Sequence, residues 1–293
     1  MITVDIGNSR FHAVVFDGAR VCGRAELPVK NATPDSVRQM LHDALSSFLV
    51  CPLDGEGGIV QTVTDCATVR SAKSLSVDLR EAVVLHRRIA VSSVVPAANE
   101  TLVDAARTLG LAVEFIAPAT HDIMPHRLPS PATTGADRLL AVRAAWEMHF
   151  RERGAGGVVV QCGTAATVDV VGRDGVFWGG MILPGPGLWL SSLGEGAALL
   201  PTLAPDEMED DAPVCGVDTR SAIAAGLRHG YFPGVVSAIL AARAYLGSDV
   251  LVVIGGGWAS RLAARLDFPA VVVRDLVAHG IRVVASGVTP KPG

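Results

Sequence analysis

Two short polar motifs could bind phosphate, and each comes at the end of an apolar segment that is typical of a β-strand. The first is Asp5-Ile6-Gly7-Asn8-Ser9-Arg10 and the second is Gln161-Cys162-Gly163-Thr164. Glycine lets the backbone approach a ligand closely, and the amide and hydroxyl groups of such turns donate hydrogen bonds to phosphate oxygens. Together the motifs predict a nucleotide site, whereas either one alone is equally compatible with a tight hairpin.

A carboxylate and a glycine run extend this hypothesis. Asp5 is placed at a strand end, where it could hold Mg²⁺ through water, because Mg²⁺ keeps much of its hydration shell in proteins. Gly255-Gly256-Gly257 follows the apolar residues 251–254 and precedes a helical pattern. A strand, a glycine run and a helix N-terminus can form a surface for an adenosine or a phosphate, so Gly255 and Gly256 are candidate nucleotide contacts. The alternative is a crowded strand-to-helix turn.

The elements that must position these motifs follow a hydrophobic pattern that occurs twice. In the first copy, strands are predicted at 2–6, 11–16, 20–27, 59–63, 89–95 and 112–116, with helices after Pro34 and at 67–81 and 97–109. In the second copy, strands are predicted at 157–161, 165–171, 176–182, 250–254 and 270–273, with helices at 135–152, 219–245, 257–266 and 275–285. A proline-rich passage from 118 to 131 separates the copies, since proline suits irregular connections. The repeat predicts two duplicated α/β domains, 1–117 and 118–293, whose phosphate motifs face each other across a cleft.

The composition is that of a globular chain. The 293 residues include 25 Lys and Arg against 29 Asp and Glu, and 49% of the residues are hydrophobic. A formal net charge of −4 without a dense basic cluster argues against nucleic-acid binding, and no apolar run approaches the ~20 residues of a membrane helix. Five scattered cysteines and a start without signal-peptide features predict a cytoplasmic protein with reduced thiols.

Seven blocks, in order along the chain, resemble the type III pantothenate kinases. They are DIGNSR at 5–10, SSVVP at 92–96, GADR at 135–138, CGTAATVD at 162–169, GGMILPG at 179–185, TRSAIAAG at 219–226 and GGG at 255–257. This family belongs to the superfamily of acetate and sugar kinases, Hsp70 and actin. The resemblance therefore implies two ribonuclease-H-like domains, as in actin-like ATPases, with a nucleotide cleft between them.

The resemblance also implies a reaction and a set of site residues. The reaction is transfer of the ATP γ-phosphoryl group to pantothenate, the first step of coenzyme A synthesis, in which one carboxylate accepts the hydroxyl proton. The family's base corresponds to Asp137. Its ATP-phosphate positions correspond to Asp5, Gly7, Asn8, Ser9, Arg10 and Thr164, with Ile6 inside the same loop. Its pantothenate positions correspond to Gly135, Ala136, Asp137, Arg138 and Thr219. Family members are homodimers with the pantothenate pocket near the subunit interface.

Two departures from the family's pattern bear on the site. The family has Asp where this chain has Gln161, and that Asp binds an activating K⁺ or NH₄⁺. An amide offers a carbonyl oxygen without the negative charge, so the sequence leaves activation by a monovalent cation open. In the lead-in to GADR, the Tyr, Asn and Leu positions of the family are occupied by Leu128, Ser130 and Thr134. The Tyr contact to the substrate is therefore missing.

Three functions follow from these observations. An active pantothenate kinase is favoured because Asp5, Asp137, Arg138 and Thr219 occur together. A catalytically weak nucleotide-binding protein with a regulatory or accessory role is the alternative that Gln161 and the altered lead-in suggest. A kinase of another small alcohol is the third reading, which the missing Tyr leaves open.

Overall fold

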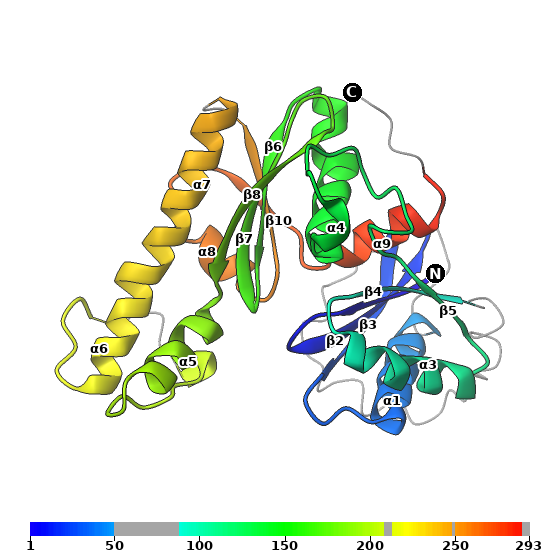
Figure 1. Cartoon of the computed structure of the whole chain (residues 1–293), viewed down its shortest axis with the longest axis horizontal. Coiled ribbons are helices and arrows are strands. Elements are labelled where there is room, and N and C mark those ends of the chain that lie inside the picture. Colours follow the sequence, from blue (N-terminus) through cyan, green and yellow to red (C-terminus); the bar gives the residue numbers. More distant parts are fainter. Residues whose placement is uncertain (50–87, 208–212, 248–249, 289–293) are drawn as a thin grey trace, which may run out of the picture.

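The computed structural model describes residues 1–49, 88–207, 213–247 and 250–288. Within these ranges the chain forms two mixed five-stranded sheets with helices packed on them (Figure 1). The strand expected at 59–63 and the helix expected at 67–81 lie outside the described residues. None of the described helices is long and apolar enough to cross a membrane.

The first sheet has the strand order β3-β2-β1-β4-β5. The antiparallel meander that the sequence predicts is present as β1 (Ile2–Ile6), β2 (Arg10–Asp17) and β3 (Arg20–Pro28). Two strands join it in parallel, β4 (Arg88–Ser93) and β5 (Ala112–Phe115). Helices α1 (Pro34–Leu49) and α3 (Asn99–Thr108) cover one face, where Ile2, Val4 and Ile6 enter the apolar core.

The opposite face of the first sheet carries the polar residues, because successive side chains of a strand alternate between faces. Asp5 lies between Val4 and Ile6 in β1, and it is paired with His12 of β2 and Ser92 of β4. Helix α9 (Leu276–Ala285), near the end of the chain, packs on this face through Ala278. The N-terminal phosphate motif therefore lies on the side of the sheet that faces the second half of the chain.

The second sheet repeats the order and the directions of the first. Its strands are β6 (Gly157–Cys162), β7 (Ala165–Val171), β8 (Phe177–Pro184), β9 (Leu251–Gly255) and β10 (Ala270–Val272), arranged β8-β7-β6-β9-β10. The first three are antiparallel neighbours, and β9 and β10 are added in parallel. The expected duplication of the α/β unit is thus confirmed.

Two helices lie between the sheets. Helix α4 (Ala136–Ala145) and α9 belong to one buried cluster together with Ala90 of β4 and Val159 of β6. Their backbones approach closely at Gly280, where a Cβ would lie 2.1 Å from the carbonyl oxygen of Leu140. The outer face of the second sheet packs on α7 (Phe232–Leu246) and α8 (Ala259–Ala263). Residues that face inward from either sheet therefore pack against α4 and α9.

The helices differ in four places from the predicted spans, and one of these is the helix expected at 257–266, which is the shorter α8. The helix expected at 135–152 is α4 followed by a π turn and a 3₁₀ turn, and the helix expected at 219–245 is α6 (Thr219–Gly226), the π turn Leu227–Tyr231 and α7. Pro233 in the first turn of α7 has no N–H, so the hydrogen-bond ladder changes there. Helix α5 (Pro186–Gly196) was not expected, because three glycines in its 11 residues lower its helix propensity.

Candidate active site

The β1–β2 turn presents the first phosphate motif at the end of a strand. The Gly7 N–H donates to the carbonyl oxygen of Arg10 at 3.0 Å, which closes a tight turn. Asn8, Ser9 and Arg10 are exposed. The side chain of Ile6 is buried in the core of the first sheet, so this residue can offer a ligand only its backbone.

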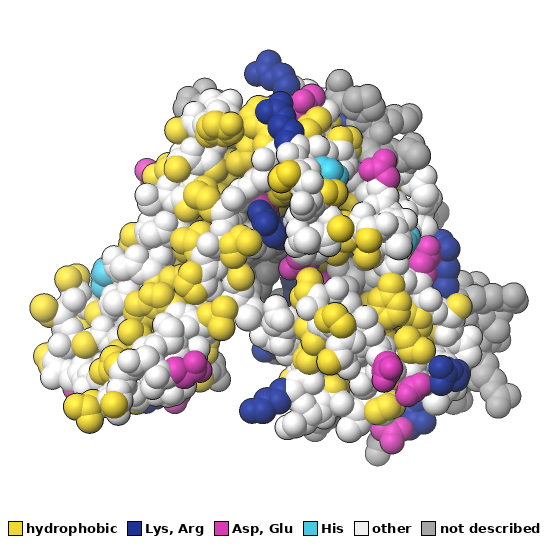
Figure 2. Space-filling view, viewed as in Figure 1, with side chains coloured by type: hydrophobic (Ala, Val, Ile, Leu, Met, Phe, Trp, Pro, Cys, Tyr) yellow, Lys and Arg dark blue, Asp and Glu magenta, His cyan; other side chains and the backbone are white. Residues whose placement is uncertain are grey.

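The two phosphate motifs meet in the structure. Ser9 Oγ lies 2.7 Å from Oγ1 of Thr164, in the β6–β7 turn, although the two residues are 155 positions apart. Figure 2 shows that the surface is hollowed between the lobe that holds α5 and α6 and the lobe that holds α1 and β2. The hydroxyl groups of the two halves therefore lie together, as the repeat in the sequence predicts.

Asp5 has a carboxylate oxygen that no protein group satisfies. Its Oδ1 is buried without a hydrogen-bond partner, and the same holds for Oγ of Ser92, directly opposite in β4. Burial, followed by the nearby charge of Asp137, raises the pKa of Asp5 to about 7. Burying a polar atom without a hydrogen-bond partner costs free energy, unless a ligand or a water molecule binds to it. The residues present therefore fit a hydrated cation.

The surroundings of Asp5 suit Mg²⁺ better than a metal held wholly by protein. Among the described residues, no group of three or more His, Cys, Asp or Glu side chains could hold a metal ion. Mg²⁺ is commonly bound by one or two carboxylates together with water and substrate phosphates. Asp5, in the strand that leads into the phosphate loop, matches that requirement.

Asp5→Asn is expected to stabilise the ligand-free protein and to abolish turnover. The pKa of Asp5 is raised from 3.8 to about 7, so the native state holds this proton between these pH values while the unfolded state has released it. The stability of the wild type therefore falls as pH rises through this window. Asn carries no charge, so the variant is expected to be more stable by about 2–4 kcal/mol at pH 8 and by much less at pH 4. Urea unfolding at both pH values measures this, and a pH-independent difference would contradict it.

Helix α4 begins at the GADR motif. Gly135 is the residue before the helix, and Asp137 Oδ1 accepts a hydrogen bond from the Arg138 N–H at 2.9 Å. A Cβ at Gly135 would lie 2.4 Å from that oxygen, so a larger residue here would displace the Asp137 carboxylate. Burial raises the pKa of Asp137, and the Arg138 N–H offsets part of the effect. A carboxylate with a raised pKa is a stronger general base.

Arg138 is held by a carboxylate to which the sequence analysis assigned no role. Its Nη2 and Nε donate to Oδ1 of Asp169, at 2.5 and 3.1 Å. Asp169 lies in the middle of β7 and is buried, and only 15% of the Arg138 side chain is exposed. Two charge-assisted hydrogen bonds fix the direction of the guanidinium at the start of α4. The signal in the sequence was a single carboxylate within the apolar strand AATVDVV.

Gln161 and the glycine run lie against each other. Gln161 is paired with Gly255, and a Cβ at Gly255 would lie 2.4 Å from Gln161 Oε1. Gly256 has a φ of 92°, and its Cβ would lie 2.5 Å from the carbonyl oxygen of Cys162. Close packing accounts for both glycines, as in the crowded turn that the sequence allowed. A contact with adenosine stays a prediction.

Thr219 does not join the other substrate positions within one chain. It opens α6, where Asp218 accepts a hydrogen bond from the Ser221 N–H at 2.8 Å, and it is exposed. Figure 1 places α6 at the far end of its lobe, away from α4 and the GADR motif. The structure therefore brings Asp5, Ser9, Thr164 and Asp137 to one region and leaves Thr219 outside it.

Comparison with known proteins agrees with this site. A family model described as type III pantothenate kinase matches residues 60–242. This chain belongs to the type III pantothenate kinase family. A type III pantothenate kinase from Treponema pallidum (strain Nichols) is 31% identical over 301 residues, covering 99% of this chain and 96% of that protein. Another from Myxococcus xanthus (strain DK1622) is 35% identical over 198 residues, covering 67% of this chain and 74% of that protein.

Solved structures support the fold. A Baf family transcriptional activator from Campylobacter jejuni is 17% identical with a TM-score of 0.53, and the match covers 98% of both chains. The ethanolamine utilization protein EutJ from Carboxydothermus hydrogenoformans is 14% identical with a TM-score of 0.50, covering 97% of this chain and 89% of that one. As a member of the type III pantothenate kinase family, the chain is a kinase, and its two mixed five-stranded sheets with their helices form an α/β architecture.

Proposed function

We propose that this chain transfers the γ-phosphoryl group of ATP to the primary hydroxyl of pantothenate, in the cytoplasm. The observation that carries the proposal is the convergence of Asp5 and Asp137 near the Ser9–Thr164 contact, from strands and helices of both halves. Family membership supports the choice of pantothenate as the substrate.

In this proposal each group has a separate task. The β1–β2 turn and Thr164 bind the ATP phosphates, with Arg10 as the cationic side chain of the loop. Asp137 accepts the proton of the attacking hydroxyl at its carboxylate, and its raised pKa suits that step. Arg138, oriented by Asp169, attracts the carboxylate end of pantothenate. Asp5 would hold Mg²⁺ through water, and there the ion would supply positive charge to balance that of the phosphates.

The proposal includes a homodimer. Thr219 is far from Asp137 in its own chain, so we propose that the substrate pocket is completed by Thr219 of a second copy. Large apolar side chains are exposed on the lobe of β8, α5 and α7, and Figure 2 shows apolar surface along it. They include Met181, Ile182, Leu188, Leu240 and Tyr245. Exposed apolar patches of this kind are typical of protein interfaces. Sedimentation should give twice the chain mass of 30.4 kDa, and a monomer mass would exclude this pocket.

The decisive test of the proposal is phosphorylation of pantothenate by Mg²⁺-ATP, with Na⁺ alone and with added K⁺ or NH₄⁺. We expect turnover in Na⁺ that K⁺ does not change, because Gln161 lacks the charge that favours a bound cation. Turnover only with K⁺ would mean that other groups form the cation site. The absence of turnover in both conditions would contradict the kinase assignment.

Two other functions are each supported by a specific feature of the sequence. A nucleotide-binding regulatory or accessory protein is favoured by Gln161 and by Leu128 in the lead-in to GADR, and it predicts ATP binding without turnover. A kinase of another small alcohol is motivated by Leu128 alone, and it predicts turnover of a different acceptor. Calorimetric measurement of ATP binding, together with the turnover assay, distinguishes the accessory protein from an active kinase. Turnover assays with a panel of alcohols identify a kinase of another acceptor.

A further inference from the structure

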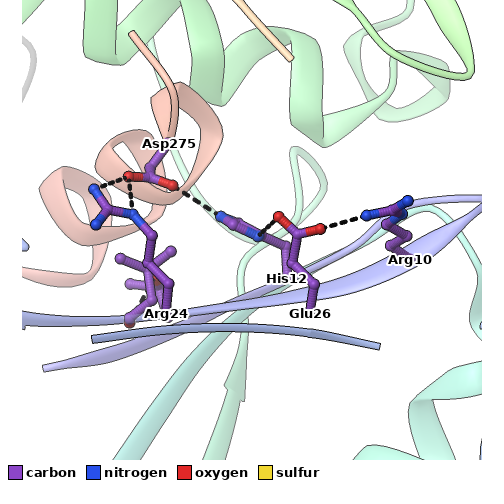
Figure 3. A network of polar contacts seen from close by, with 7 residues as sticks. Arg10, His12, Arg24, Glu26 and Asp275 are labelled. Atoms are coloured by element: carbon purple, nitrogen blue, oxygen red, sulfur yellow. Dashed lines mark hydrogen bonds and ion pairs between the residues drawn. The ribbon is translucent and has the colours of Figure 1, made fainter. Parts of the chain in front are cut away.

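Five charged side chains form one continuous chain from the phosphate loop to α9 (Figure 3). Arg10 Nη1 lies 2.6 Å from Glu26 Oε2, and Glu26 Oε1 lies 3.1 Å from His12 Nδ1. His12 Nε2 lies 3.0 Å from Asp275 Oδ1, and Arg24 donates to the other Asp275 oxygen at 2.6–2.7 Å. Each carboxylate therefore lies between two cationic groups.

The strand register explains how these residues meet. His12 of β2 is directly opposite Glu26 of β3, and Arg10 and Arg24 occupy diagonal positions on the same face. Directly opposite and diagonal side chains of antiparallel strands are within reach of each other. Asp275 immediately precedes α9, which packs on this face, although it is 263 positions from His12. His12 and Arg24 thus both link the β2–β3 pair to Asp275 before α9, and of the two only His12 also contacts Glu26.

Positive and negative groups alternate along this network of five side chains. Burial works to lower the pKa of His12, but hydrogen bonds to Asp275 and Glu26 outweigh it and raise this pKa to about 9. The hydrogen bond from His12 leads the effects that lower the pKa of Glu26 to about 2. His12 is therefore an imidazolium at neutral pH and donates from both ring nitrogens.

From Asp275 to Arg10, the linked side chains run from buried to exposed. The exposed fractions of the side chains are 2% for Asp275, 20% for His12, 35% for Glu26 and 66% for Arg10. An exposed arginine has considerable rotamer freedom, and ordering it when a ligand binds costs affinity. A buried anchor that already holds the arginine reduces this cost before the ligand arrives.

We propose that His12 is a positioning residue, which acts through Glu26 to preorganise Arg10 for the ATP phosphates and through Asp275 to align the phosphate loop with α9. This inference rests on the proposed function, in which the loop binds ATP. His12 itself touches no reacting atom. Its contribution is to nucleotide affinity and not to proton transfer.

The test compares His12→Gln and Glu26→Gln in the full-length protein, with His42→Gln as the matched control. His42 is a partly exposed histidine of α1, beside Asp43 and on the other side of the first sheet. For His12→Gln and Glu26→Gln we expect the KM for ATP and the Kd for the non-hydrolysable analogue AMP-PNP to rise about tenfold. This is the change in affinity that corresponds to the free energy of one charged hydrogen bond. The kcat and the KM for pantothenate should stay close to those of the wild type. The control should change none of these values.

The double variant gives a second readout. Because both residues act on Arg10 through one chain, His12→Gln combined with Glu26→Gln should weaken AMP-PNP binding no more than either change alone. Unchanged AMP-PNP affinity in folded Glu26→Gln, judged by thermal melting, would overturn the inference. Loss of stability or kcat with constant AMP-PNP affinity would also overturn it, since that is the result of a purely structural role. If the wild type binds AMP-PNP without phosphorylating pantothenate, the proposed function fails while the binding data still decide the role of His12.

Discussion

Asp137→Asn is expected to lower the kcat for pantothenate phosphorylation by about 10²–10⁴-fold, the usual contribution of a general base. Asn keeps the shape of the side chain and can still accept the Arg138 N–H through its carbonyl oxygen, so the start of α4 should be preserved. The amide cannot accept the proton of the attacking hydroxyl. The KM for ATP should change little, because the phosphate loop belongs to other elements.

Asp35→Asn is the matched control for this change. Asp35 also lies in the first turn of a helix with an arginine nearby, but it is exposed and on α1, outside the site. Single-turnover measurement of the chemical step compares the two variants with the wild type. Undiminished turnover in folded Asp137→Asn would show that another group is the base.

Asp169→Asn is expected to destabilise the protein by up to about 3 kcal/mol, because it leaves the Arg138 guanidinium in a largely buried position without a counter-charge. Burial raises the pKa of Asp169, so removal of its buried charge offsets part of this loss. Without Asp169, the Arg138 guanidinium is no longer held in one orientation, so the KM for pantothenate should also rise. Adding Arg138→Gln to the variant should recover part of the lost stability, since the unpaired charge is then removed. Equilibrium unfolding in urea measures the free energies of all three proteins.

A surface pair provides the control for Asp169→Asn. Asp104 pairs with Arg107 at 2.8 Å on α3, and more than half of each side chain is exposed. Asp104→Asn is expected to cost less than about 1 kcal/mol, because water screens and replaces such a contact. A loss of similar size in the two variants would mean that burial does not strengthen the Arg138–Asp169 pair.

Local pattern accounts for the elements that the sequence predicted well. The meanders β1–β3 and β6–β8 have apolar alternation and turns at Asp-Gly, and both signals lie within a few residues of each other. The repeat of that pattern also predicted that Ser9 and Thr164 would face each other, because duplicated units place equivalent turns at equivalent strand ends. The glycine-rich α5 and the two π turns were missed, since packing overrides the weak local preference of those segments.

The sequence by itself determined the two duplicated sheets and the polar motifs at their strand ends, and its resemblance to the family is the basis for proposing Asp137 as the base. Only the tertiary structure decided which carboxylates hold the site's cationic side chains. Asp169 reaches Arg138 across 31 positions, and Asp275 reaches His12 across 263. Such pairs depend on strand register and on the packing of α4 and α9 between the sheets. Strand register and helix packing produce no periodic pattern in the sequence. Which residues pair is therefore known only once the distant segments are seen together in the folded protein.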